Sequence, residues 1–354
     1  MNKIDVIKAH FRAALRYELN LREPKSYNEK IQWLKLFYQD PLLTRCADKI
    51  AVKDHVREKL GRDICIPTLA AYRTVEDFRI EDLPDQFVLK LNSGSGQMLI
   101  CADKKSFDFD AAHARIATWL EPASNHYFFG HEWAYKNIQP GVIAEQLLGN
   151  GEPLRNYKFI CFNGEPNCLY TTVQLGGKLY VDFYDFEWNH LPFDLLDYPN
   201  SPQPPLRPDK LEEMICISKI LAKDFPFVRV DLYCIESRVF FGELTFYPSN
   251  GTVSFDPQKA DYDLGALLTL PDHAVLLPDE NKPPIKVSLD ALHELCDLTD
   301  HLPPSPHAHV DVEMAHLVDK IERMQKSYSW RLTAPFRFLR RLFYRPPVTL
   351  KSAH

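Results

Sequence analysis

Residues 228–245 read VRVDLYCIESRVFFGELT, which indicates two apolar β-strands joined by a short polar turn. Asp231 lies on the first strand and Glu243 on the second, so antiparallel pairing would let the two carboxylates face one another. Thr245 shares the face of Glu243, because side chains alternate along a strand. Two carboxylates on one face of an apolar hairpin repel each other and lose hydration unless a cation lies between them. We therefore predict a Mg²⁺ site formed by Asp231, Glu243 and Thr245.

The alternative is that both carboxylates are exposed on a solvated face. The flanking residues are mostly Val, Leu and Phe, which makes the hairpin too apolar to be freely solvated.

Two cationic residues accompany this hairpin. Arg229 precedes Asp231 by two positions and shares its strand face, where it would stabilise an oxyanion or hold a phosphate. The alternative for Arg229 is a salt bridge with one of the acids. Lys158, in the strand predicted over residues 157–162, is either a surface lysine or a phosphate contact, depending on whether it faces the cleft.

A second pattern, DQFVLKLNSGSG at residues 85–96, indicates a strand that carries Lys90 and runs into a turn of small residues. Residues 98–101 would return as the partner strand of a hairpin. Small residues let backbone N–H groups approach an anion, and the lysine supplies the opposite charge. The order differs from that of a P-loop, because the lysine precedes the glycines. An ordinary hairpin turn is the alternative.

The segment ADKIAVK at residues 47–53 is expected to lie in a helix that runs from Pro41 to Leu60. Asp48 and Lys49 are neighbours that need not touch. The residues alone therefore predict a solvated helix face around Lys49.

Helical segments mixed with antiparallel hairpins predict an α+β fold rather than alternating βαβ units. We expect a mainly helical region at residues 1–84 and one α+β unit with the small-residue loop at 85–148. A second α+β unit with the metal site would occupy 149–270. Residues 271–354 would form a Pro-rich linker, a helix at 312–326 and a basic tail.

Composition excludes several classes of protein. The 354 residues contain no apolar run of 18 residues and no signal-peptide pattern at the N-terminus, which predicts a cytoplasmic protein. The eight cysteines form no CxxC pair, which argues against a zinc site or a disulfide framework. A net charge of −6 argues against nucleic-acid binding. Residues 331–354 contain six Arg or Lys and no acid, so a basic tail follows an acidic body.

The order of these motifs along the chain resembles that of the ATP-grasp superfamily. The residues within the motifs resemble those of its TupA-like branch, which is associated with the biosynthesis of bacterial surface polymers, including teichuronopeptide. The resemblance covers roughly residues 10–270. It rests on YNEKIQW at 27–33, ADK at 47–49, FVLK at 87–90, YKF at 157–159, FNGEP at 162–166, DFPFVRVDLY at 224–233 and FGELT at 241–245.

The resemblance implies that ATP is held between two α+β subdomains. It places Lys49 and Lys90 at the α- and β-phosphates, Glu145 at the adenine or ribose, and the backbone near Leu147 at the adenine edge. The residues that would close over the nucleotide are Ser93, Gly94, Ser95 and Gly96.

For the metal, the resemblance implies Mg²⁺ on Asp231 and Glu243. Arg229, near the transferred phosphoryl group or the tetrahedral intermediate, and Lys158 are the residues expected to act in catalysis. The superfamily usually has Asn at the position of Thr245. A hydroxyl is a weaker ligand, so Thr245 would act through water.

The implied reaction is ligation of a carboxylate to an amine through an acyl phosphate, with release of ADP. The implied substrates are a sugar acid or acidic polymer unit and an amino acid or simple amine. The alternatives are an ATP-grasp kinase that phosphorylates a sugar hydroxyl and a non-catalytic nucleotide-binding component of a polymer-assembly complex.

The end of the chain supports a polysaccharide context. SYSWRLTAPFR at residues 327–337 resembles a terminal motif of assorted bacterial polysaccharide-synthesis enzymes. Aromatic and aliphatic residues interleaved with arginines suit an interfacial helix on anionic lipid at the inner membrane. The alternative is a helix docked on the acidic body or on a partner enzyme.

Overall fold

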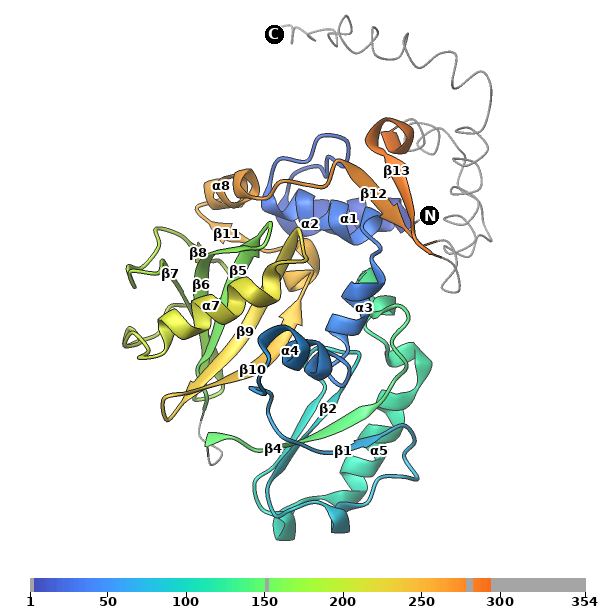
Figure 1. Cartoon of the computed structure of the whole chain (residues 1–354), viewed down its shortest axis with the longest axis vertical. Coiled ribbons are helices and arrows are strands. Elements are labelled where there is room, and N and C mark those ends of the chain that lie inside the picture. The colour runs from blue at the N-terminus through green and yellow to red at the C-terminus, as the bar shows by residue number, and fades with distance from the viewer. Residues whose placement is uncertain (1–2, 150–152, 278–282, 294–354) are drawn as a thin grey trace, which may run out of the picture.

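The computed structural model describes residues 3–149, 153–277 and 283–293. Two antiparallel sheets form the body, with helices above and between them (Figure 1). This α+β arrangement agrees with the predicted fold class. The helix predicted at 312–326 and the tail at 327–354 lie outside the described residues.

The smaller sheet, which we call the lid sheet, has four strands in the order β1-β4-β2-β3, all antiparallel. Its strands are β1 (Thr68–Tyr72), β2 (Phe87–Leu91), β3 (Met98–Cys101) and β4 (Val142–Gln146). Helix α5 (Phe109–Leu120) covers one face, where Leu89 and Ile116 are fully buried. The opposite face carries Lys90, Glu145 and Ile100, because side chains alternate along each strand.

The larger sheet has five antiparallel strands in the order β10-β9-β5-β6-β7. They are β5 (Asn156–Phe162), β6 (Glu165–Leu175), β7 (Lys178–Tyr184), β9 (Phe227–Ile235) and β10 (Arg238–Thr245). Helix α7 (Leu211–Ala222) packs on this sheet, and Val228, Val230 and Leu232 of β9 are completely buried. The predicted 228–245 hairpin is confirmed as β9–β10.

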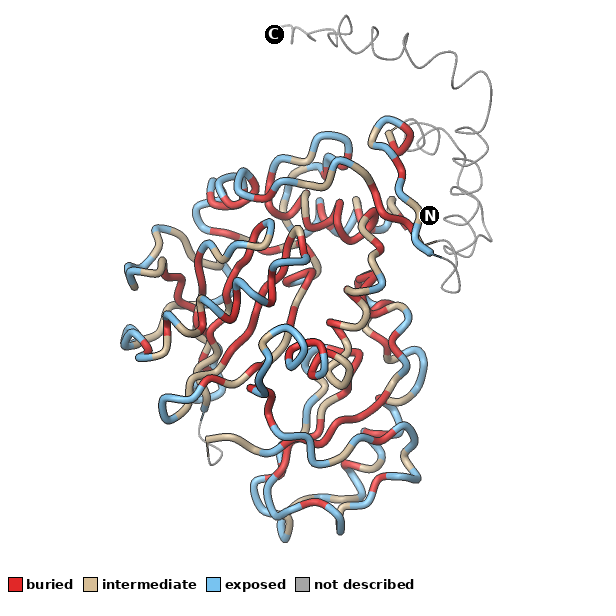
Figure 2. Tube along the Cα trace, in the orientation of Figure 1, coloured by how far each residue is buried: buried red, intermediate tan, exposed pale blue. Residues whose placement is uncertain are grey.

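The N-terminal region contains four helices, α1 (Lys3–Leu15), α2 (Tyr27–Phe37), α3 (Pro41–Ala47) and α4 (Val52–Leu60). Helix α2 starts at a capping box, in which Ser26 and Glu29 bond each other's backbone N–H groups. Nearly all of α2 is buried (Figure 2). It packs against helix α8 (Lys259–Leu267) and the short turn η6 (Pro248–Gly251), which follows β10.

The continuous helix expected from Pro41 to Leu60 is wrong. The chain forms α3 and α4 separated by a turn at residues 48–51. Asp48 Oδ1 accepts from Ile50 N at 2.8 Å and from Asn92 Nδ2 at 2.9 Å. An Asp side chain that bonds the backbone two residues on favours a turn over a helix. Lys49 is therefore presented from a turn and not from a helix face.

Residues beyond 270 also differ from the expected linker. Strands β12 (His273–Leu276) and β13 (Ile285–Ser288) pair as an antiparallel hairpin. The hairpin is tied to the end of α2, because Gln39 N donates to Val275 O at 2.7 Å and Leu277 N donates to Gln39 Oε1 at 2.9 Å.

Across the described residues, the helices are too short or too polar to cross a bilayer.

Candidate functional site

The β9–β10 hairpin brings four predicted site residues together. Glu243 is directly opposite Asp231, and Thr245 is opposite Arg229. The register shifts between Phe241 and Glu243, where Gly242 approaches the neighbouring strand so closely that an added Cβ would lie 2.9 Å from Asp231 O. A glycine at this bulge thus permits the pairing of the two carboxylates.

Arg229 contacts the other three site residues of the hairpin. Its Nε and one terminal nitrogen bond the two oxygens of Asp231 at 2.6 and 2.7 Å. The same terminal nitrogen lies 3.0 Å from Glu243 Oε1 and 2.9 Å from Thr245 Oγ1. Of the two interpretations of Arg229, the structure therefore shows the salt bridge, which Arg229 makes with both acids.

Two residues of adjacent strands complete this cluster. Lys158 of β5 donates to Asp231 Oδ2. Tyr170 of β6, which is opposite Lys158, accepts from the second terminal nitrogen of Arg229 at 3.0 Å. Burial, together with the positive charge of Arg229, lowers the pKa of Lys158. Lys158 thus faces the cluster rather than solvent.

Glu243 is the more accessible of the two carboxylates. Its side chain is 33% exposed, against 1% for Asp231. Burial by itself would raise the pKa of Glu243, but the charges of Lys49, Lys158 and Arg229 outweigh this effect and hold the pKa well below its ordinary value. Glu243 is therefore a carboxylate at every physiological pH.

Lys49 connects the cluster to the lid sheet. Its Nζ lies 3.7 Å from Glu243 Oε2 and donates to the carbonyl of Gly94 at 2.6 Å. Its backbone N donates to Asn92 O. The turn that replaces the expected helix thus brings Lys49 between the small-residue loop and β10.

On the lid sheet, Glu145 binds two lysines. Lys90 Nζ lies 2.7 Å from Glu145 Oε2, and Lys53 Nζ lies 2.5 Å from Glu145 Oε1. Burial would raise the pKa of Glu145, yet the two lysines outweigh it and lower the pKa. Lys53 also donates to Ile66 O and Thr68 Oγ1, both at 2.7 Å. Glu145 thereby positions Lys90 on the open face of the lid sheet.

The small-residue loop joins β2 to β3 as predicted. Asn92 is fully buried at its start, donates to Asp48 Oδ1 and Gln139 O, and accepts from Gly141 N. Ser93 is also fully buried, and its hydroxyl has no hydrogen-bond partner. Gly96 has a φ of +82°, which glycine adopts without strain. Ser95 and Gly96 are exposed at the tip.

An apolar strip lies beside Lys90 on the open face. Met98 is opposite Lys90 and Ile100 is opposite Val88, and both are about half exposed. Leu147, predicted at the adenine edge, follows the end of β4 and is partly buried. Exposed apolar side chains thus stand on the same face of the lid sheet as Lys90.

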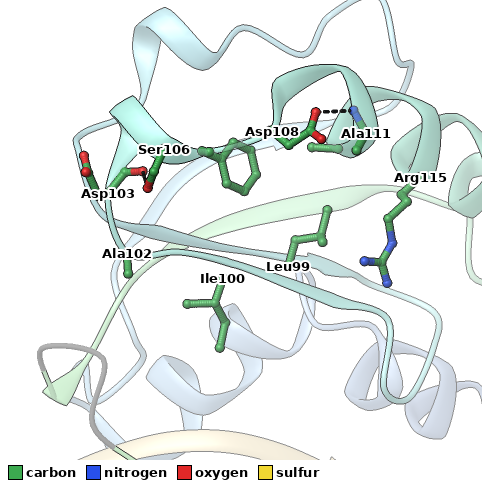
Figure 3. Close-up of a pocket in the computed structure, with 10 residues that line it drawn as sticks. Leu99, Ile100, Ala102, Asp103, Ser106, Asp108, Ala111 and Arg115 are labelled. Atoms are coloured by element: carbon green, nitrogen blue, oxygen red, sulfur yellow. Dashed lines mark hydrogen bonds between the residues drawn. The ribbon is translucent and has the colours of Figure 1, made fainter.

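A surface hollow on the lid lies elsewhere. It is lined by β3, α5 and the segment between them, and includes Leu99, Asp108 and Arg115. Figure 3 shows Leu99 turned toward α5, whereas Ile100 points to the other side of the sheet. The hollow is thus separated from Lys90 by the sheet itself.

Most oxygen donors of the cluster already bond other side chains. Within the described residues, no three His, Cys, Asp or Glu side chains gather at one point. Both oxygens of Asp231 are bonded by Arg229 and Lys158, and Thr245 Oγ1 bonds Arg229 and Glu243 Oε1. Glu243 Oε2 has Lys49 at 3.7 Å as its neighbour. One carboxylate completed by phosphate oxygens and water suits Mg²⁺, so Glu243 fits the ion in this arrangement.

Three residues of this site escaped the sequence analysis: Lys53, Tyr170 and Asn92. Lys53 stands four positions after Lys49, a spacing that any solvated helix also shows. Tyr170 and Asn92 carried no signal beyond their positions in a strand and beside a glycine loop. The spatial neighbours of all three come from distant segments.

The family model described as TupA-like ATPgrasp matches residues 29–269. No curated protein matches the chain.

Three solved structures illustrate the structural likenesses. D-alanine–D-alanine ligase from Bacillus anthracis complexed with ATP is 15% identical over 57% of this chain and 53% of its own, with a TM-score of 0.34. The Helicobacter pylori D-alanine–D-alanine ligase is 15% identical over 64% and 61%, with a TM-score of 0.33. Phosphoribosylamine–glycine ligase from Thermotoga maritima is 13% identical over 70% and 64%, with a TM-score of 0.35. The matched region thus spans 53% to 64% of the length of these three structures.

Proposed function

Because this chain belongs to the TupA-like ATP-grasp family, we propose that it is an ATP-dependent ligase that joins a carboxylate to an amine and releases ADP. The observation that carries the proposal is the excess of positive charge between the two sheets. Five cations meet three carboxylates there: Lys49, Lys53, Lys90, Lys158 and Arg229 against Glu145, Asp231 and Glu243. An excess of two formal charges suits a polyanion such as a triphosphate.

The contacts support a specific orientation of ATP. Lys49 and Lys90 are the cations nearest the small-residue loop, so they would bind the phosphates, and the unpartnered Ser93 hydroxyl would donate to a phosphate oxygen. The adenine would lie on Met98 and Ile100, whose apolar side chains are exposed on the same face as Lys90.

Mg²⁺ would be held by Glu243 and by phosphate oxygens, with Asp231 and Thr245 as further ligands if Arg229 turns toward the substrate. When bound, the ion would neutralise charge on the β- and γ-phosphates.

The chain's own residues then account for both steps of ligation. The donor carboxylate attacks the γ-phosphate, and Lys49 and Arg229 stabilise the charge that develops on the transferred phosphoryl group. The acyl phosphate so formed is attacked by an amine, and Arg229 stabilises the oxyanion as phosphate leaves. The loop at residues 93–96 would exclude water, which otherwise hydrolyses the acyl phosphate.

The same cluster favours a ligase over a sugar kinase. A hydroxyl acceptor needs a base to take its proton, but Asp231 is bonded by two cations and the pKa of Glu243 is held well below its ordinary value. Both acids are therefore weak bases. A carboxylate donor is already ionised and requires no base in this step.

The proposal is tested with hydroxylamine, which traps acyl phosphates as hydroxamates. Wild-type protein with Mg·ATP, D-glucuronate and hydroxylamine should release ADP and form a hydroxamate. Glu243→Gln should lower the rate at least about 100-fold, because it removes a charge from the phosphoryl-transfer site. The matched control is Glu165→Gln, whose carboxylate is 63% exposed and pairs with Lys219 on the surface.

Release of AMP would contradict the proposal. A phosphosugar without hydroxamate would establish the kinase instead. No loss of activity in Glu243→Gln would refute the metal role of that residue.

We further propose that the carboxylate belongs to a sugar acid of a bacterial surface or capsule polysaccharide, and that the enzyme works in the cytoplasm. The basic tail at residues 327–354 would bring it to the inner-membrane surface or to a partner enzyme of polysaccharide synthesis. Co-sedimentation with anionic liposomes, with and without residues 327–354, distinguishes the membrane from a partner enzyme. Liposome binding that is lost on truncation supports the membrane, and equal sedimentation of the two proteins excludes it.

A further inference from the structure

A histidine–glutamate pair lies beside the small-residue loop and has no part in the function proposed above. His126 precedes the short helix α6 (Tyr127–Gly130), and its backbone N donates to Ser93 O at 3.2 Å. Its side chain is 24% exposed, so a small molecule can reach it. His126 is therefore attached to the loop expected to cover the phosphates.

Glu132 orients this histidine. Its Oε1 lies 3.3 Å from His126 Nε2, and its side chain is only 5% exposed. The ring of His126 packs edge-on against Tyr135 of the following turn η4 (Trp133–Tyr135), with the centroids 5.1 Å apart. A proton on Nε2 satisfies the buried carboxylate and leaves Nδ1 with a free lone pair.

The pair is linked to the strand of Glu243 through helix α3, which packs against both the turn η4 and β10. Tyr135 is buried, which raises its pKa well above the ordinary value, and the negative charges of Glu132 and Glu243 both add to that rise. Tyr135 is thus within electrostatic reach of both acids.

We propose that His126, oriented by Glu132, is the base that removes a proton from the amine acceptor. This inference rests on the proposed ligase function. It adds a base, which the residues proposed to bind the phosphates and Mg²⁺ do not provide. Asp231 and Glu243 are paired with cations, whereas an imidazole whose second nitrogen is free can accept a proton from the acceptor.

The step balances as follows. An ammonium acceptor gives one proton to His126 Nδ1, and its nitrogen lone pair forms the C–N bond to the acyl carbon. The C–O bond to phosphate breaks, and phosphate leaves with the bonding electrons and the second proton. The third hydrogen stays on the amide nitrogen, and His126 returns its proton to solvent.

Charged groups of helices α1 and α2 lie near the His126–Glu132 pair. Lys35 of α2 is within electrostatic reach of Glu132, and Lys3 of α1 is within reach of Lys35. Tyr135, on the other side of the imidazole, is not ionised at neutral pH because burial raises its pKa. Glu132 is thus the carboxyl group in contact with the imidazole.

The test compares two acceptors in the full-length protein with Mg·ATP and D-glucuronate. Glycine is an ammonium ion at neutral pH and needs a base, whereas hydroxylamine is largely unprotonated and does not. His126→Gln should lower kcat/KM for glycine at least about 100-fold and change the hydroxamate rate by less than about threefold. Imidazole added to the assay should restore glycine activity to His126→Ala.

The control is His10→Gln, which alters an exposed histidine of α1 and should leave both rates unchanged. Equal losses of rate with both acceptors in His126→Gln, or a wild-type rate with glycine, would overturn the role of His126. Hydroxamate formation by the wild type would still support the ligase function in either case. If the wild type forms no hydroxamate, the ligase function itself fails and the role of His126 fails with it.

Discussion

Replacing Lys53 with methionine removes a buried positive charge and keeps most of the side-chain volume. In the native protein, Lys53 Nζ bonds Glu145 Oε1 at 2.5 Å, and Ile66 O and Thr68 Oγ1 at 2.7 Å each. The Lys53 and Glu145 side chains are 7% and 8% exposed, so water cannot replace these bonds. The substitution leaves Ile66 O and Thr68 Oγ1 without this donor, and it removes one of the two positive charges that neutralise the Glu145 carboxylate.

The size of the effect follows from these contacts. Breaking a buried ion pair by removing one partner costs about 3 to 5 kcal/mol. Glu145 keeps its ion pair with Lys90 at 2.7 Å, so the charge of Glu145 is still partly neutralised. The lower end of this energy range therefore applies. We expect Lys53→Met to lower the free energy of unfolding by about 3 kcal/mol.

Urea denaturation of the purified protein measures this change. Lys259→Met is the matched control, because Lys259 pairs with Asp263 on the surface, with the two side chains 76% and 58% exposed, and should cost no more than about 0.5 kcal/mol. The double variant with Glu145→Gln should show coupling of at least about 1 kcal/mol. A loss for Lys53→Met as small as that of the control, or the absence of coupling, would refute the reasoning.

Three further outcomes are expected. Tyr170→Phe removes the acceptor of an Arg229 N–H, bonded at 3.0 Å, and should lower kcat/KM for ADP release about tenfold; unchanged kinetics would exclude a positioning role. Gly265→Ala would bring a Cβ within 2.2 Å of the Lys25 carbonyl oxygen and should destabilise the protein by about 3 kcal/mol in urea; a loss below about 1 kcal/mol would contradict this close packing. Burial lowers the pKa of Lys35 from 10.5 to about 7, so the unfolded chain binds more protons between these values and stability should rise by about 2 kcal/mol from pH 7 to pH 9. Lys35→Met should abolish that rise, and an identical pH profile for both proteins would show that Lys35 does not cause it.

The sequence by itself determined the elements whose signals are local. The alternation of apolar residues around Asp231 and Glu243 predicted a hairpin that pairs the two acids, and the structure confirms that pairing. The order of the motifs identified the TupA-like ATP-grasp family, which the match over residues 29–269 confirms. Strand pairing of adjacent segments depends on a short turn and a period-2 pattern, both of which are visible in the residues.

Only the tertiary structure decided where the cations point. Asp48 leaves the expected helix because its carboxylate bonds Asn92, 44 residues away. Lys53 meets Glu145, which is supplied by β4, and Lys49 meets Glu243, which is supplied by β10. A lysine on a solvated helix and a lysine in a nucleotide site have the same local pattern. The difference arises from the acids, carbonyl groups and burial that distant segments bring to each one when the sheets assemble.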